Sequence, residues 1–346
     1  MLSLLAASGV NVDRAFPGLG PAAADRRRAL AITGLVNIVR TAESVGAETI
    51  LIVGGLFDDR TVSTTAMKTV VPLLNAFAGR VLIAPGAQDP YTPQGPHSTT
   101  EWGPRTSVWT SVDFADPLAT GPVRVLGRAL RPGGSGVPAF PHIVQGDGCV
   151  VLAGAELPVD RCVSWAGDGP GRHVVTTGPQ ETLLEGLTVL EDVNPSLGSA
   201  AGNAALILLD GSNVVSVEFK AVLEAAAGAV VPVDMSEITS TDALLGALNR
   251  AVSSAPAWSV VRLMGIVRQG VLLPALAGRS HDRDDVRVDM GDLSFAFEEP
   301  ESSDHTAMSE FVRSLSRDSA DDRSRHQAIA LGLAAFEASA REQAEP

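Results

Sequence analysis

The stretch that decides the fold is Thr49-Ile50-Leu51-Ile52-Val53-Gly54-Gly55-Leu56-Phe57-Asp58. Five residues suited to a buried strand run directly into a glycine-containing turn. The same design occurs twice more, in Leu2-Ser3-Leu4-Leu5-Ala6-Ala7-Ser8-Gly9-Val10 and in Arg80-Val81-Leu82-Ile83-Ala84-Pro85-Gly86-Ala87-Gln88-Asp89-Pro90. The first 90 residues therefore predict three buried strands, each of which opens into a turn.

Helices are expected between these strands. The segment 25–46 has Asp25 as a candidate N-cap and Gly46 at its end, and its apolar residues recur at intervals of three and four. A second helix is expected over 63–77, with a kink at Pro72. A helix between two strands covers one face of their sheet, so the pattern predicts an α/β fold. The Pro- and Gly-rich stretch 84–106 is expected to be a long loop.

In their order and spacing, the three turns resemble those of the calcineurin-like metallophosphoesterases and, within them, the SbcD-type DNA repair nucleases. That family carries D-x-H after its first strand, G-D-x-F-D after its second and G-N-H-D after its third. Here the three turns read Ser8-Gly9-Val10, Gly54-Gly55-Leu56-Phe57-Asp58 and Gly86-Ala87-Gln88-Asp89. The resemblance implies a phosphoesterase-like β-sandwich flanked by helices over residues 1–220.

The family's metal-binding residues are largely replaced. A pair of divalent cations about 3.5–4 Å apart needs carboxylate, imidazole and amide ligands. A glycine and a Gly-Pro-Gln-Glu stretch stand in the places of the later histidine motifs, and Gln88 stands where the family keeps a histidine that serves as an acid. The vestigial cleft positions are Ser8, Val10, Gly55, Asp58, Ala87, Gln88, Asp89, Gly154, Pro179 and Glu181. From them we expect no metal, no cofactor and no catalytic residue.

The remaining polar residues of the cleft leave a second interpretation open. Asp58 and Asp89 are expected to tie down loops, the six histidines to lie on the surface or in loops, and Arg26 to Arg28 to form a solvated face. Alternatively, Asp58, Asp89, His97, His142 or His173 hold one cation in a divergent metal-dependent phosphoesterase or nuclease. A third interpretation, a small-molecule binding module in the vacated cleft, has no residue in its favour.

The second half of the chain predicts a hairpin and a smaller domain. Ala205–Leu209 and Val214–Phe219 flank an Asp-Gly turn. Strands over 230–233, 258–267 and 286–297 then alternate with helices over 243–252 and 271–277. This β-α-β-α-β order resembles the α+β capping domain of SbcD-type nucleases, here 221–297.

The C-terminal segment 304–343 is expected to form a helical hairpin after an acidic linker. Its two apolar stripes consist of Met308, Phe311, Val312 and Leu315, and of Ile329, Leu333 and Phe336. In SbcD-like proteins such a hairpin binds the coiled-coil base of an SMC-like (SbcC-type) ATPase, so the resemblance implies that partner. The alternative is that both stripes pack on the body of the chain itself.

Composition limits the function classes. The net charge of −14 and the presence of only two lysines argue against a protein that binds nucleic acid over its whole surface. Residues 281–346 hold 16 acidic and 7 basic residues, so the tail is the acidic part. The two cysteines form no disulfide framework, and no long apolar run suggests a membrane span, so we expect a cytoplasmic protein.

These features together predict a catalytically silent SbcD-like subunit that docks an SMC-like ATPase and scaffolds or regulates DNA processing. DNA contact through that complex and a homodimer are left open.

Overall fold

A computed structural model describes residues 2–114, 117–120, 123–133, 138–141, 149–169, 171–199, 202–211, 213–268, 271, 283–295, 306–316, 328–329 and 332. The chain divides into two compact units. The first comprises residues 1–17 and 21–227, and the second comprises 18–20 and 228–346. The first unit ends close to position 220, where the sequence placed the end of its first domain.

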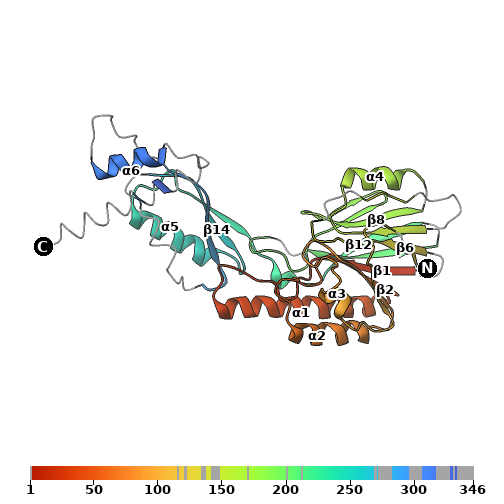
Figure 1. Ribbon diagram of the computed structural model, residues 1–346. Helices are drawn as coiled ribbons and strands as arrows, with labels where there is room; N and C mark the ends of the chain where they lie inside the picture. The colour runs from red at the N-terminus through yellow and green to blue at the C-terminus, as the bar shows by residue number, and fades with distance from the viewer. Residues whose placement is uncertain are drawn as a thin grey trace. The chain divides into compact units, whose positions relative to one another are not determined.

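The first unit contains two six-stranded sheets (Figure 1). The order of the first sheet is β12-β11-β1-β2-β3-β4, formed by Val214–Ala221, Asn203–Leu209, Leu2–Ala7, Thr49–Val53, Arg80–Ala84 and Thr106–Val108. The order of the second is β5-β6-β7-β8-β10-β9, formed by Pro117–Thr120, Val123–Gly127, Cys149–Ala153, Arg172–Thr177, Leu187–Leu190 and Thr182–Leu184. Because β1, β2 and β3 pair in parallel, their carboxyl ends meet at one end of the sheet.

Side chains on the two faces of these strands contribute to three apolar layers. Leu5 and Ala7 of β1 face a core shared with the helices α1 (Pro21–Ser44) and α2 (Thr64–Ala76), whereas Leu4 and Ala6 face the second sheet. A third core lies between the second sheet and α4 (Val159–Gly167). Figure 1 shows α1 and α2 on one side of the paired sheets and α4 on the other. The first unit is thus a helix–sheet–sheet–helix sandwich, and the predicted α/β class is confirmed.

Several boundaries differ from those predicted. Helix α1 begins at Pro21, because proline suits the first helical position, so Asp25 lies inside the helix and is not its cap. Ser63 caps α2, which continues through Pro72. The expected loop 84–106 contains the short helix α3 (Pro96–Thr99).

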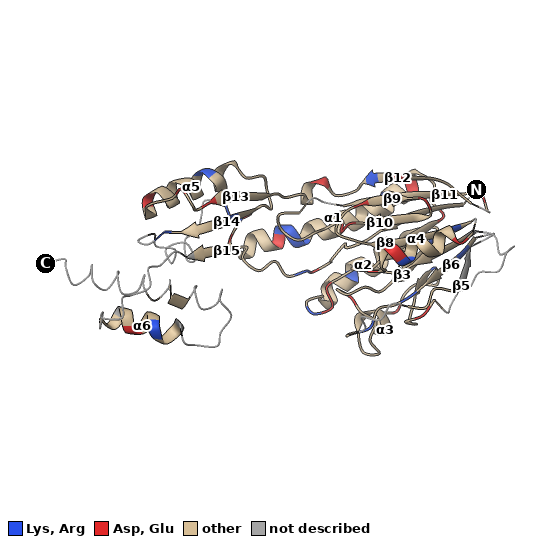
Figure 2. Cartoon of the chain, turned by 90° about the horizontal axis from the view of Figure 1, so that it is seen from above, with Lys and Arg blue, Asp and Glu red and all other residues tan. Residues whose placement is uncertain are grey.

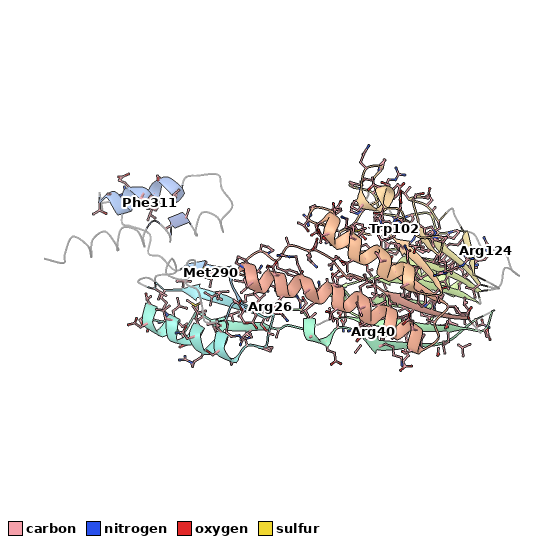
Figure 3. All side chains as sticks on the ribbon, turned by 90° about the horizontal axis from the view of Figure 1, so that it is seen from below. Arg26, Arg40, Trp102, Arg124, Met290 and Phe311 are labelled. Atoms are coloured by element: carbon pink, nitrogen blue, oxygen red, sulfur yellow. The ribbon has the colours of Figure 1, made fainter. Side chains whose placement is uncertain are left out.

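Arg27 corrects the expectation of a solvated basic face. Its side chain is buried, and its guanidinium donates to the carbonyl oxygens of Ala226 at 2.7 Å and Pro195 at 3.1 Å. Burial lowers the pKa of Arg27 to about 10. Its neighbour Arg26 is exposed, as is Arg40 near the other end of α1 (Figure 3).

The second unit is built on a three-stranded parallel sheet with the order β13-β14-β15, formed by Val230–Asp234, Val260–Val267 and Arg287–Phe295. Helix α5 (Thr241–Ser254) connects β13 to β14 and packs Leu244 and Leu248 on the sheet. Its cap is Ser240, whose hydroxyl accepts a hydrogen bond from the backbone N–H of Ala243. The expected helix 271–277 lies outside the described residues except for Val271.

Successive side chains of β15 alternate between two environments. Val288 and Met290 of β15 pack against the core that contains α5. Arg287 and Asp289 lie in an ion-paired group with Arg262 of β14. Helix α6 (Ala307–Ser316) follows within this unit. None of the described helices is both long and apolar enough to cross a membrane.

Candidate functional site: the turn cluster

The three predicted turns come together at the carboxyl ends of β1, β2 and β3. We refer to residues 8–11, 54–58 and 86–89, with Gly154 and Ala155 after β7, as the turn cluster. The N–H groups of Gly9 and Asn11 donate to the carbonyl oxygens of Gly54 at 3.0 Å and Gly55 at 2.8 Å. The Gly54 N–H donates in turn to Ala84 at the end of β3, at 2.8 Å. The first two turns therefore continue the sheet instead of leaving it.

The backbones of these turns are in close contact with one another. Gly55 has φ +64°, and a Cβ at this position would lie 2.9 Å from Cα of Gly9 and 3.0 Å from Oδ1 of Asn11. A Cβ at Gly54 would lie 2.8 Å from Cβ of Ala155, and one at Gly86 would lie 2.7 Å from Cα of Gly54. Real Cβ atoms do not approach other atoms this closely, so glycine is required for the closure.

The two sheets are also joined directly at this end. The N–H groups of Val193 and Asn194 donate to the carbonyl oxygens of Ser8 and Gly9, both at 2.9 Å, and Ser8 forms a parallel bridge with Asp192. A Cβ at Gly9 would lie 2.0 Å from Oδ1 of Asp192. The segment after β10 is therefore pressed onto the first turn and closes the gap between the sheets.

Asp89 organises the centre of the cluster. Its Oδ1 accepts hydrogen bonds from Gly55 N and Gly86 N, each at 2.8 Å, and its Oδ2 accepts one from Leu56 N at 2.9 Å. Nε2 of His97 lies 3.1 Å from the same Oδ2. With both oxygens used in this way, Asp89 holds the second and third turns together, and the predicted loop-tying role of this residue is confirmed.

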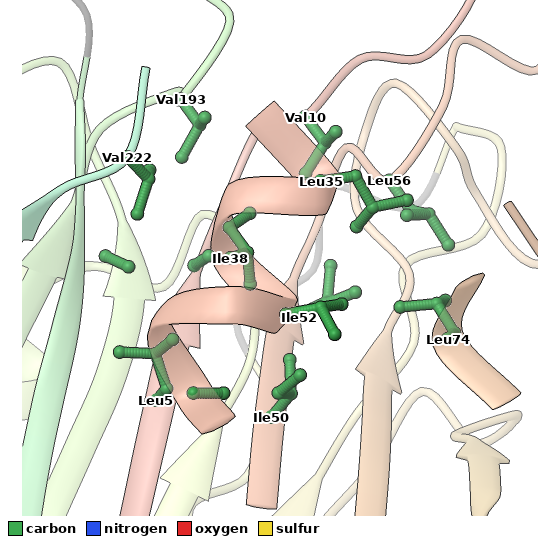
Figure 4. Close-up of a cluster of buried hydrophobic side chains, with 14 of the residues drawn as sticks. Leu5, Val10, Leu35, Ile38, Ile50, Ile52, Leu56, Leu74, Val193 and Val222 are labelled. Atoms are coloured by element: carbon green, nitrogen blue, oxygen red, sulfur yellow. The ribbon is translucent and has the colours of Figure 1, made fainter. Parts of the chain in front are cut away.

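The other predicted positions have different surroundings. Val10 is fully buried on the helix side of the first sheet, in the core that contains Leu35 and Leu56 (Figure 4). Asp58 is buried and accepts from Arg60 N and Nε, which is a local contact. Ala87 is exposed and Gln88 is partly exposed.

The later motif positions do not add a ligand. A Cβ at Gly154 would lie 2.8 Å from Cγ of Arg128, so an arginine side chain fills the space beside it. Pro179 has no donor atom in its side chain, and it is exposed after β8. The carboxylate of Glu181 accepts from the backbone and side-chain nitrogens of Asn203, which fixes it to the start of β11.

The histidines correct another expectation. His97 and His173 are buried, not on the surface. His97 lies against Phe57 at a ring-centroid distance of 4.5 Å, and Trp102 donates from Nε1 to the carbonyl oxygen of His97. His173 belongs to β8, where its Nε2 lies 2.9 Å from Oγ1 of Thr188, and burial lowers its pKa to about 4. His142, His281, His305 and His326 lie outside the described residues.

A polar group that the sequence analysis missed lies beside the first turn. Asn11 Nδ2 is 3.2 Å from Oδ2 of Asp192, and Nη1 of Arg14 is 3.6 Å from the same atom. Burial raises the pKa of Asp192, while the charge of Arg14 and the hydrogen bond from Asn11 lower it. The only signal for Asp192 in the sequence is its place two residues after an apolar strand segment that ends at Leu190.

Within the described ranges, no group of three or more His, Cys, Asp or Glu residues could hold an ion. The one carboxylate at the centre, Asp89, already accepts three backbone hydrogen bonds. A divalent cation would have to displace those bonds and separate turns that are in van der Waals contact.

Comparisons with known proteins do not identify a family. A scan against protein-family models gave no match, and a search of curated proteins found no relative of this chain.

Proposed function

We propose that this chain is a catalytically silent subunit with a calcineurin-like, SbcD-type architecture, which docks an SMC-like ATPase and scaffolds or regulates DNA processing. One observation carries the proposal. The turns that correspond to the family's metal-binding motifs are packed backbone to backbone at Gly9, Gly55, Gly54 and Gly86. A site of this shape can neither hold a cation nor activate water for attack on a phosphodiester.

The architecture supports the proposed fold assignment. Two sheets with helices on both outer sides, and three successive β-strand turns at one end, are what the resemblance implies for residues 1–220. The parallel strand–helix–strand order of 230–295 is what it implies for a capping domain. The chemistry has been lost from the loops, and the strands that position those loops have been retained.

The alternative of a relocated metal site has less support. Of its five candidate ligands, Asp89 and His97 are in contact, and both side chains are fully buried. Asp58 is engaged with Arg60, and His173 pairs with Thr188 inside the second sheet. His142 lies outside the described residues. Two ligands within a closed cluster fall short of the set that a catalytic cation requires.

The proposed docking element is the C-terminal hairpin. Helix α6 carries Phe311, Val312 and Leu315 at helical spacing, and Val312 and Ile329 are buried. A Cβ at Gly332 would lie 2.1 Å from the ring of Phe311, so the two segments of the hairpin are in contact there. Leu333 and Phe336, and the side chain of Met308, lie outside the described residues. A partly paired hairpin with further apolar residues suits helix-in-groove recognition of a coiled coil.

Two measurements test the proposal. Purified protein is incubated with Mn²⁺, freed of unbound ion and analysed for metal, and its hydrolysis of bis-p-nitrophenyl phosphate and of DNA ends is assayed with Mn²⁺. We expect neither stoichiometric metal nor turnover. Turnover that requires Mn²⁺ and is abolished by Asp89→Asn would overturn the silent assignment. Co-expression with a coiled-coil SMC-like ATPase from the same genome tests the partner, and failure to co-purify with such an ATPase would remove that half of the proposal.

A further inference from the structure

Exposed apolar side chains of the first unit gather at one edge of the sandwich. Among its described residues, the large exposed hydrophobics are Val112, Val159, Val163, Leu183, Leu184 and Val215. Four of these six lie on or beside a groove of about 880 Å³, which is lined by α4, the start of β8, β9 and β12. Clustered exposed apolar residues are typical of interaction surfaces rather than of free solvent-facing edges.

Two of the elements that line this groove are edge strands. In the part of the chain that the structure describes, β12 has a strand neighbour, β11, on one side, and β9 has β10 on one side (Figure 2). The apolar groove lies between these two edges and includes Leu183, Leu184, Val214 and Val217. Such edges present backbone donors and acceptors that can pair with another strand.

The charges on β12 indicate which strand would pair with it. Glu218 and Lys220 form an ion pair two residues apart on the same face of β12, and the side chain of Glu218 is 64% exposed. When a strand pairs antiparallel with its own copy, opposite residues must lie on the same face. Registers centred on Glu218 or on Lys220 place like charges opposite each other and are disfavoured.

A register centred on Phe219 places opposite charges across from each other. Glu218 of each copy then lies opposite Lys220 of the other, and the four side chains form a square of alternating sign. The strand segment that pairs is 217–221, because Val222 and Leu223 turn into the core of their own unit. We propose that the chain forms a homodimer through antiparallel pairing of β12 with β12 of a second copy, which covers the apolar groove beside it.

This proposal is independent of the silent-subunit assignment, since it uses neither the turn cluster nor the C-terminal hairpin. The interface extends the first sheet continuously across the two copies. The acidic net charge opposes association at long range, so the dimer depends on local charge pairing and on the groove.

Sedimentation velocity of the full chain over a concentration series tests the interface. We expect a wild-type dimer with a dissociation constant on the order of micromolar. Glu218→Lys and Lys220→Glu should each weaken it at least about tenfold, because both symmetry-related contacts become repulsive. The double variant Glu218→Lys with Lys220→Glu restores alternating charges and should restore the dimer. Glu43→Lys, an exposed site on α1, makes the same charge change as Glu218→Lys and serves as the control.

A monomeric wild-type protein would overturn the proposal. So would a dimer that both single variants leave unchanged, or one that the double variant does not rescue. Leu183→Asp, on the facing edge, provides a second measurement. It should also weaken the dimer if the groove is covered, and circular dichroism of each variant shows whether it remains folded.

Discussion

Asp89 and His97 form a buried pair, with Nε2 of His97 3.1 Å from Oδ2 of Asp89 and both side chains at 0% exposure. The aspartate also accepts three backbone N–H bonds from two different turns. A carboxylate with this many donors fixes loop geometry, because each N–H would otherwise be buried without an acceptor. The pair that comes nearest to a catalytic arrangement in the turn cluster therefore stabilises the closed loops.

Replacing Asp89 should be costly. In Asp89→Asn one acceptor oxygen becomes an NH₂ group that faces backbone donors, so we expect a loss of about 3 kcal/mol in the free energy of unfolding. Urea denaturation followed by circular dichroism measures the loss.

Asp59→Asn is the matched control for this prediction. Asp59 is only partly buried, and burial and then the nearby charge of Asp58 raise its pKa, so loss of its charge should cost little. An Asp89→Asn protein as stable as the Asp59→Asn protein would contradict the organising role.

Gly55 tests the backbone closure itself. Gly55→Ala places a Cβ 2.9 Å from Cα of Gly9, at a residue whose φ is +64°. We expect destabilisation of about 3 kcal/mol or more, which combines backbone strain with a steric clash. Gly46→Ala separates the two effects, because Gly46 has φ +66° but nothing within 4 Å of the added Cβ. That control should lose only about 1 kcal/mol, and equal losses in chemical denaturation would show that the turns can part.

The local elements of this fold were predictable, whereas the contacts that close the cluster were not. The apolar segments that form β1, β2 and β3 and the glycine turns after them can be recognised in the sequence, because burial and turn chemistry act within ten residues. Asn11 meets Asp192 across 181 positions, and Arg27 reaches carbonyl oxygens 168 and 199 positions away. No periodicity encodes such pairs. Val10 was visible in the sequence as an apolar residue of the first turn, but its place in the helix-side core became clear only from packing.

His173 should make stability depend on pH. Burial lowers its pKa from 6.5 to about 4 in the folded chain, so the folded protein keeps it neutral. Above pH 6.5 both states are neutral at this residue and its contribution is constant. As the pH falls from 6.5 towards 4, the unfolded chain takes up a proton that the folded chain does not, and stability declines by about 3 kcal/mol.

The difference between wild type and His173→Gln isolates this effect from the other titrating groups. The unfolding free energies of the two proteins are measured at several pH values. They should differ least near pH 4, where the wild type has lost its advantage, and most near pH 7. A difference in unfolding free energy that stays constant across that range would show that folding does not lower the pKa of His173.

The C-terminal hairpin supplies the last prediction. Deletion of residues 304–346 should leave a folded protein that no longer captures a co-expressed SMC-like ATPase, because the apolar stripes of the hairpin are the proposed docking element. A point change tests the same element with less disruption. Gly332→Val forces a side chain into the ring of Phe311, where even a Cβ would lie 2.1 Å from the ring, so the two segments must separate and capture should fail.

Gly246→Val is the control for this variant, since the nearest atom to a Cβ on Gly246 of α5 is Arg250 Nη1 at 3.5 Å. It should retain capture. If the deletion unfolds the protein, as circular dichroism would reveal, the stripes belong to the core of the second unit. If the truncated protein folds and still co-purifies with the ATPase, the docking surface lies elsewhere on the chain.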